Sequence, residues 1–149
     1  GLRALEKAAV VAGGGGNHRR GLDDMVLVKD NHLVCHPGFS GLAGVVRQIR
    51  TEHPKVRIEI EADDLRQVQA ILRDVDVDLV LLDNMRPAQL REAVALAKDT
   101  KVKLEASGGV TIKNVRVIAA TGVDFISIGA LTHSARAIDL SLEITNVGA

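Results

Sequence analysis

The sequence predicts an α/β fold in which parallel strands form an open sheet or a (β/α) barrel. Five short aliphatic or β-branched runs are typical of strands. Segments with a helical period separate these runs, so strand and helix alternate at spacings of about 20 to 30 residues, as in parallel α/β folds. The predicted strands lie at residues 25–29, 56–61, 78–83, 102–107 and 124–129.

Three of these runs are mostly apolar, which suits parallel strands covered on both faces. The run "RIEIE" alternates, and "KLEAS" carries one charge in its middle. In a barrel, alternate strand residues point inward.

Predicted helices precede, separate and follow the strands. Pro87 stands at a first helical turn, where its missing N–H costs nothing, and Gly122 follows a helix end. The leading helix covers residues 2–12, four more cover 42–49, 64–72, 87–97 and 112–120, and a trailing one follows Ser134.

Composition predicts one globular domain over residues 1–149, with 46% hydrophobic and 26% charged residues. The 19 basic and 19 acidic residues cancel, so no overall field attracts nucleic acid or an anionic membrane. Only Phe39 and Phe125 are aromatic, too few for base stacking. No apolar stretch approaches the ~20 residues of a membrane span. With the single Cys35, this predicts a cytoplasmic protein with no nucleic-acid or membrane partner.

Polar residues stand where the predicted strands end, at Lys29, Glu61, Asp83, Ser107 and Gly129. The carboxyl ends of parallel strands share one edge, and ligands of such folds bind there. Carboxylates at Glu61 and Asp83 can hold Mg²⁺ and sugar hydroxyls, or face a developing cation. The alternative is that these acids cap the helices that follow.

Two turns carry glycines and offer backbone N–H groups to a phosphate, namely "ASGGV" with Gly108 and Gly109, and "SIGAL" with Gly129. Their alternative role is a tight strand-to-helix turn. A third glycine run, Gly13 to Gly16, adjoins His18, Arg19 and Arg20, which predicts a local anion site approached closely by the backbone.

Zinc is a weaker hypothesis, raised by His32, Cys35 and His36 in "HLVCH". No second ligand cluster accompanies them, so the sequence favours a reading without a metal at that trio. His53 and His133 are interpreted as ordinary surface or turn residues.

Six motifs in order, "GGGGNHR", "KDNH", "IEIE", "LLDN", "ASGG" and "SIGALTHS", give nearly the whole chain a resemblance to the barrel domain of the quinolinate phosphoribosyltransferase family. That family uses Mg²⁺ to condense quinolinate with phosphoribosyl pyrophosphate, yielding nicotinate mononucleotide, pyrophosphate and CO₂ in NAD synthesis. The resemblance implies an incomplete (β/α) barrel. Its partners would be quinolinate, phosphoribosyl pyrophosphate and a second subunit of a homodimer or larger homo-oligomer.

The resemblance also implies roles for residues. His18, Arg19 and Lys29 would face the quinolinate carboxylates. Glu61 and Asp83 would lie near the ribose and Mg²⁺ and, with Lys29, would be the catalytic groups. The turns that hold the ribose phosphate would be formed by Ser107, Gly108, Gly109, Ile128, Gly129 and Ala130.

The sequence departs from the family pattern at its start. Family members have an N-terminal domain and a first barrel strand ending in a "TRKT"-like stretch, whereas this sequence opens at "GLR". We therefore expect a fragment or a degenerate copy, inactive alone because a neighbouring subunit's N-terminal domain supplies an arginine. Two alternatives stay open: a non-catalytic anion-binding or assembly remnant, and a molybdenum-transport-associated member of the superfamily, against which "KDNH" and "LLDN" argue.

Overall fold

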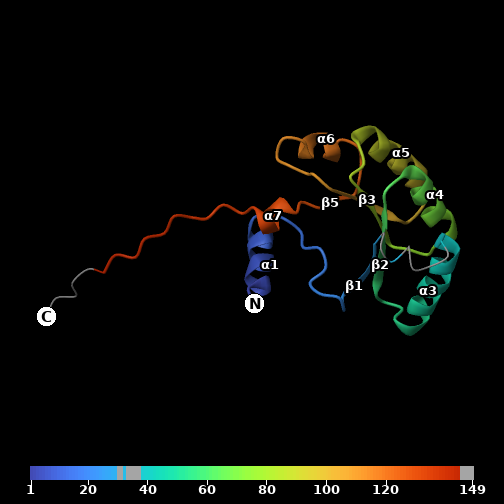
Figure 1. Cartoon of the computed structure of the whole chain (residues 1–149), viewed down its shortest axis with the longest axis horizontal. Coiled ribbons are helices and arrows are strands. Elements are labelled where there is room, and N and C mark those ends of the chain that lie inside the picture. The colour runs from blue at the N-terminus through green and yellow to red at the C-terminus, as the bar shows by residue number, and fades with distance from the viewer. Residues whose placement is uncertain (30–31, 33–37, 145–149) are drawn as a thin grey trace.

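A computed structural model describes residues 1–29, 32 and 38–144 and contains one parallel five-stranded sheet in the order β1-β2-β3-β4-β5 (Figure 1). Each predicted aliphatic run contains a strand, so the predicted α/β fold is confirmed. The last strand is shorter than expected, because the chain leaves the sheet soon after Ile126. The strands are β1 (Met25–Val28), β2 (Arg57–Ala62), β3 (Leu79–Asp83), β4 (Lys103–Ser107) and β5 (Phe125–Ile126).

Helices alternate with the strands as expected. The three longest of those between strands lie together along one side of the sheet (Figure 1). Pro87 begins one helix, and Gly122 follows another with a positive φ of 94°, as the sequence predicts. The helices are α1 (Arg3–Ala12), α3 (Gly38–Glu52), α4 (Leu65–Asp74), α5 (Pro87–Ala97), α6 (Val115–Ala119) and α7 (Ala130–His133).

The trailing helix expected after Ser134 is wrong. A short α7 precedes that point, and residues 135–144 form neither helix nor strand. Apolar residues in this segment alternate with polar ones, at Ile138, Leu140, Leu142 and Ile144. A period of two places apolar side chains on one side of an extended chain rather than on one face of a helix.

The two faces of the sheet differ in chemistry. In β2, Ile58 and Ile60 are fully buried and pack in the hydrophobic core with Val68 and Ile71 of α4. The alternate residues of the same strand, Arg57, Glu59 and Glu61, lie on the opposite face. The helix-covered face therefore stabilises the fold, and the other face, here called the inner face, is available for polar chemistry.

The sheet is open in the described part of the chain, with β1 and β5 at its edges. In-register pairing aligns Glu61, Leu81 and Glu105 across the inner face and sets Asp83 beside Ser107. This arrangement agrees with an incomplete barrel, and it gathers the ends of β2, β3 and β4 at one edge.

Two aspartates fix the starts of neighbouring strands in the same way. Asp78, before β3, accepts hydrogen bonds from the Ile58 N–H at 2.7 Å and from Arg50 at 2.9 Å. Asp124, before β5, accepts from the Leu104 N–H at 3.0 Å and from the Lys103 ammonium at 2.7 Å. Each carboxylate thus extends the ladder of the preceding strand and helps to set the register.

Asp124→Asn should weaken the fold in a pH-dependent way. Partial burial raises the pKa of Asp124, but the hydrogen bonds from Lys103 and from the Leu104 N–H outweigh it and hold the pKa below its ordinary value. The charged carboxylate therefore stabilises the fold above about pH 4, and this contribution is lost as the pH falls further. We expect the variant to lose on the order of 1 kcal/mol at pH 7, allowing for solvent screening, and less at pH 3.5.

Urea denaturation at both pH values measures this difference. Asp139→Asn, in the exposed segment 135–144, is the matched control and should unfold like the wild type. An Asp124→Asn deficit of equal size at both pH values would contradict the assigned role of the charge.

Candidate functional site

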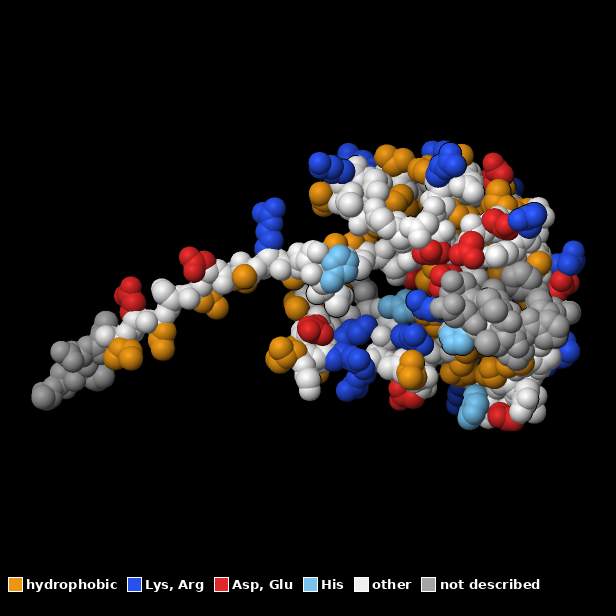
Figure 2. Space-filling model, viewed as in Figure 1, with side chains coloured by type: hydrophobic (Ala, Val, Ile, Leu, Met, Phe, Trp, Pro, Cys, Tyr) orange, Lys and Arg blue, Asp and Glu red, His pale blue; other side chains and the backbone are white. Residues whose placement is uncertain are grey.

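The predicted strand-end residues meet at one edge of the sheet. Lys29 directly follows β1, and its ammonium nitrogen lies 3.9 Å from Oε2 of Glu61 in β2. Asp83 ends β3 beside Ser107 at the end of β4. Acidic, basic and histidine side chains gather around a hollow on the face shown in Figure 2. The edge therefore joins groups suited to anions with groups suited to cations.

Neither Glu61 nor Asp83 caps a helix. The α4 helix is capped by Asp64, whose side chain accepts from the Gln67 N–H, and the N-cap of α5 is Arg86. The alternative interpretation of the two acids is therefore wrong.

Three carboxylates cluster at this edge, at Glu61, Asp63 and Asp83. One ligand oxygen from each lies within 4.8 Å of the others. Oxygen-only donor sets suit hard divalent cations, so these residues fit Mg²⁺. The sequence suggested Glu61 and Asp83 for this ion and missed Asp63, although its place two residues after Glu61 was a usable signal.

Asn84 locks the turn that follows β3. Its backbone has a positive φ of 52°, its N–H donates to the Ser107 carbonyl at 2.9 Å, and its side-chain amide donates to Asp83 Oδ2 at 2.6 Å. Gly108 packs directly against it, since a Cβ on Gly108 would lie 2.9 Å from the Asn84 nitrogen. The orientation of the Asp83 carboxylate thus depends on a glycine in the neighbouring turn.

The second glycine turn lies farther from its strand than expected. Ser127 N–H donates to the Ala106 carbonyl at 2.9 Å, which continues the ladder one step past β5. Ile128 then leaves the sheet, and Gly129 and Ala130 begin α7. The expectation that β5 ends on Gly129 is wrong, because hydrogen bonding within α7 takes over from the sheet at Ile128.

The glycine run after α1 turns the chain back toward the sheet. Gly14 has a φ of 84°, and a Cβ on Gly15 would lie 2.9 Å from Val10 Cγ1. Lys7 of α1 then donates to the backbone carbonyls of Arg19 at 2.8 Å and His18 at 3.4 Å. These glycines serve the turn itself and bring His18 onto the inner face.

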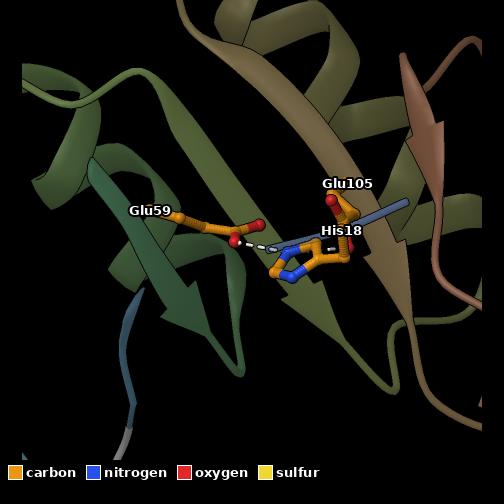
Figure 3. Close-up of side chains that lie close together, drawn as sticks. All are labelled: His18, Glu59 and Glu105. Atoms are coloured by element: carbon orange, nitrogen blue, oxygen red, sulfur yellow. Dashed lines mark hydrogen bonds and ion pairs between the residues drawn. The ribbon is translucent and has the colours of Figure 1, made fainter. Parts of the chain in front are cut away.

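His18 meets two buried glutamates there (Figure 3). Its Nε2 lies 2.9 Å from Oε2 of Glu59 and 3.6 Å from Oε1 of Glu105. Glu59 is fully buried, and Glu105 is 4% exposed and accepts a hydrogen bond from the Ser127 hydroxyl. Sequence reasoning gave neither glutamate a role, although each is a charged residue in the middle of a predicted strand.

Contacts within this cluster shift the pKa values of His18 and Glu105. The hydrogen bond with Glu59 raises the pKa of His18, with support from the charge of Glu105 and against the effects of burial and Arg19. Burial raises the pKa of Glu105, against the hydrogen bond from Ser127. The contacts with the two glutamates therefore favour the protonated imidazole of His18 more than water would.

The remaining histidines form no comparable cluster in the part of the chain that the structure describes. His32 is exposed, and its Nδ1 accepts a hydrogen bond from the Lys29 N–H at 2.9 Å. His133 contacts the Ser134 hydroxyl at 2.7 Å, and His53 is exposed. Cys35 and His36, the other members of the zinc hypothesis, lie outside the described residues.

Residues 1–143 match a family model described as quinolinate phosphoribosyl transferase, C-terminal domain. The chain is 42% identical over 147 residues to a nicotinate-nucleotide pyrophosphorylase (carboxylating) of Mycobacterium leprae, covering 97% of this chain and 50% of that protein. A probable enzyme of the same name from Bacillus subtilis is 38% identical, with 97% and 49% coverage. The chain thus spans about half the length of these relatives.

Solved structures agree with this similarity. The nicotinate-nucleotide pyrophosphorylase of Francisella tularensis superposes with a TM-score of 0.84 at 38% identity, covering 94% of this chain and 48% of that one. The protein of the same name from Ehrlichia chaffeensis gives 0.78 at 42% identity, with 90% and 47% coverage.

Gly108→Ala should damage the site more than Gly109→Ala. Both glycines have a positive φ, 92° and 59°, so either alanine costs about 1 to 2 kcal/mol of backbone strain. Only the Cβ on Gly108 would collide with Asn84, whereas nothing lies within 4 Å of one on Gly109. We expect the collision to cost a further ~1 to 3 kcal/mol, measured by urea denaturation. Equal losses in the two variants would show that the Asn84 contact is unimportant.

Proposed function

Because the chain belongs to the family of quinolinate phosphoribosyl transferase C-terminal domains, we propose that it supplies the active-site barrel of an enzyme of NAD biosynthesis. The reaction transfers a phosphoribosyl group from phosphoribosyl pyrophosphate to quinolinate and releases pyrophosphate and CO₂, leaving nicotinate mononucleotide. One observation carries the proposal: the Lys29 ammonium lies 3.9 Å from Glu61, at the edge of the sheet where Glu61, Asp63 and Asp83 cluster.

Quinolinate would bind at the cationic side of this edge. It is a dianion, and His18, half-buried Arg19 and Lys29 are available to its two carboxylates. Charge-assisted hydrogen bonds are about twice as strong as neutral ones, and a guanidinium can meet a carboxylate with two parallel bonds. Arg20 is exposed and outside this set.

The phosphoribosyl group would bind at the acidic side. Glu61 and Asp83 would stabilise positive charge at the anomeric carbon as pyrophosphate leaves, since fixed charges act strongly in a water-excluded site. Asn84 would hold the Asp83 carboxylate in place for this task. Glu61 and Asp83, with Asp63, would hold Mg²⁺, which when bound neutralises charge on the pyrophosphate.

The 5-phosphate would lie against the two glycine turns. Successive glycines at Gly108 and Gly109 have left-handed backbones, a conformation that can direct N–H groups outward to an anion. Ser107 would add a hydroxyl, and the second turn, Ile128 to Ala130, would close the other side.

Decarboxylation would follow attachment of the sugar. The ring nitrogen attacks the anomeric carbon as the bond to pyrophosphate breaks, which leaves a pyridinium. The bond to the 2-carboxylate then breaks, the ring accepts its electron pair, CO₂ leaves, and the ring carbon takes up a proton. The protein has to place charge and exclude water.

The oligomeric state and the cellular location of the protein are also part of the proposal. A homodimer or larger homo-oligomer rests on the family resemblance, and a cytoplasmic location rests on the single Cys35. Among the described residues, no helix is long and apolar enough to cross a bilayer. Some plant relatives are named as chloroplastic or mitochondrial.

Isothermal titration tests the proposed function. We expect quinolinate, and phosphoribosyl pyrophosphate with Mg²⁺, to bind the chain, and Asp83→Asn to weaken the second ligand more than the first. Binding is the readout because the chain spans about half the length of its relatives, and we expect little turnover from it alone. A chain that bound neither ligand would be the non-catalytic remnant. Molybdate binding in place of both would favour the transport-associated alternative.

Arg19→Lys should weaken quinolinate binding, although it keeps the charge. An ammonium cannot reproduce the two parallel bonds of a guanidinium, and one lost charge-assisted hydrogen bond corresponds to about 1.5 to 3 kcal/mol. The dissociation constant for quinolinate should rise roughly ten- to a hundredfold. Arg20→Lys is the matched control and should stay near the wild-type value. Equal dissociation constants for the two variants would remove Arg19 from the substrate site.

A further inference from the structure

Glu59 and Glu105 are buried acids that the proposed chemistry does not use. They occupy the middle of β2 and β4, where parallel strands ordinarily carry aliphatic residues. A carboxylate moved away from water costs several kcal/mol unless it is paired. Their presence on the inner face therefore needs a specific partner.

His18 is the partner that both acids share. Its Nε2 is within hydrogen-bond distance of Glu59 and 3.6 Å from Glu105, whose own oxygen also accepts from Ser127. The second oxygen of Glu59, Oε1, is buried and has no hydrogen-bond partner within the described residues. The Glu59 carboxylate has lost its hydration. A positive charge on the imidazole is the interaction that compensates for that loss.

Other charges around the ring act less directly. Arg19, the next residue in the chain, opposes a charged imidazole, and Arg57 acts on Glu105. Lys7 approaches the His18 backbone carbonyl rather than its ring. The two glutamates thus dominate the surroundings of the imidazole, and its raised pKa agrees with the geometry.

The hydrogen bond at Nε2 decides what the other ring nitrogen can do. No residue in the described ranges forms a hydrogen bond with Nδ1, so this atom is available to a ligand. With a proton on Nε2 alone, Nδ1 would present a lone pair and repel a carboxylate. With both nitrogens protonated, Nδ1 donates a charge-assisted hydrogen bond.

We propose that Glu59 and Glu105 are positioning residues that keep His18 an imidazolium, so that its Nδ1–H binds a carboxylate of the substrate. The inference rests on the proposed function for the identity of that substrate. In this proposal the two glutamates affect the affinity for quinolinate only through His18, and they do not contact the dianion. Glu59 acts more strongly, because its oxygen is the closer one.

Glu59→Gln separates charge from shape. The amide oxygen can still accept from Nε2–H, so the ring keeps its orientation while the negative charge is removed. Nuclear magnetic resonance of the imidazole nitrogens, with the His18 signal identified by its loss in His18→Gln, measures the titration without any ligand. We expect His18 to titrate at least about one pH unit lower in Glu59→Gln, and by a smaller amount in Glu105→Gln.

Quinolinate affinity supplies the second readout. At pH 7.5 the dissociation constant should rise about tenfold in Glu59→Gln, and the difference from the wild type should shrink as the pH falls toward 5.5, because acid favours the protonated ring in both proteins. Glu92→Gln, on the exposed side of α5, is the matched control and should behave as the wild type. If Glu59→Gln fails to fold by circular dichroism, Glu105→Gln carries the test.

The two measurements test separate parts of the proposal, so each part can be overturned without the other. An unchanged His18 titration in both variants would overturn the positioning role, whatever the ligand data. A lowered titration without quinolinate binding to the wild type at any pH would support control of the ring and reject the proposed substrate. A melting temperature raised by Mn²⁺ or Zn²⁺, and no longer raised in Glu59→Gln, would assign the cluster to a metal and overturn the proposal.

Discussion

The alternation of side chains along parallel strands is the constraint on which the rest of this structure depends. In β2, one set of alternate residues, Ile58 and Ile60, packs against α4, and the other set, Glu59 and Glu61, faces inward. In β4, Leu104 and Ala106 are in the core while Glu105 and Ser107 face inward. Because α3, α4 and α5 stabilise one face, the other can hold charged groups that a core could not accept.

The fold could be predicted because its signals are local. Aliphatic runs, a proline at a helix start and a glycine after a helix end act within a few residues, and β1 to β4 lie within a residue of where the sequence puts them. The prediction of the trailing helix was wrong because another local signal was overlooked. Residues 138–144 alternate with a period of two, a signal that was present and was not used.

The site could be predicted only in part, because its contacts join distant residues. Lys29, Glu61, Asp83 and Ser107 could be placed at one edge of the sheet because all four stand at strand ends, a position that the sequence reveals. In the cluster around His18, the histidine and Glu59 are 41 positions apart, and Glu105 and Ser127 are 22 positions apart. Four separate segments of the chain meet there, and no local pattern encodes their contact. The glycine run was predicted to adjoin an anion site, and the structure shows in addition that it turns the chain after α1.

A site of this kind must satisfy two opposite electrostatic demands. In the proposed reaction it would attract a dianion and then stabilise positive charge at a sugar carbon and on a ring nitrogen. The chain separates these demands by origin: His18 and Arg19 come from the segment after α1, whereas Glu61 and Asp83 come from adjacent strands. Lys29 follows β1 and lies 3.9 Å from Glu61, with about half of its side chain exposed. In the proposed role of Glu59 and Glu105, the buried carboxylates would let positive charge on His18 face the ligand while the protein interior stays balanced.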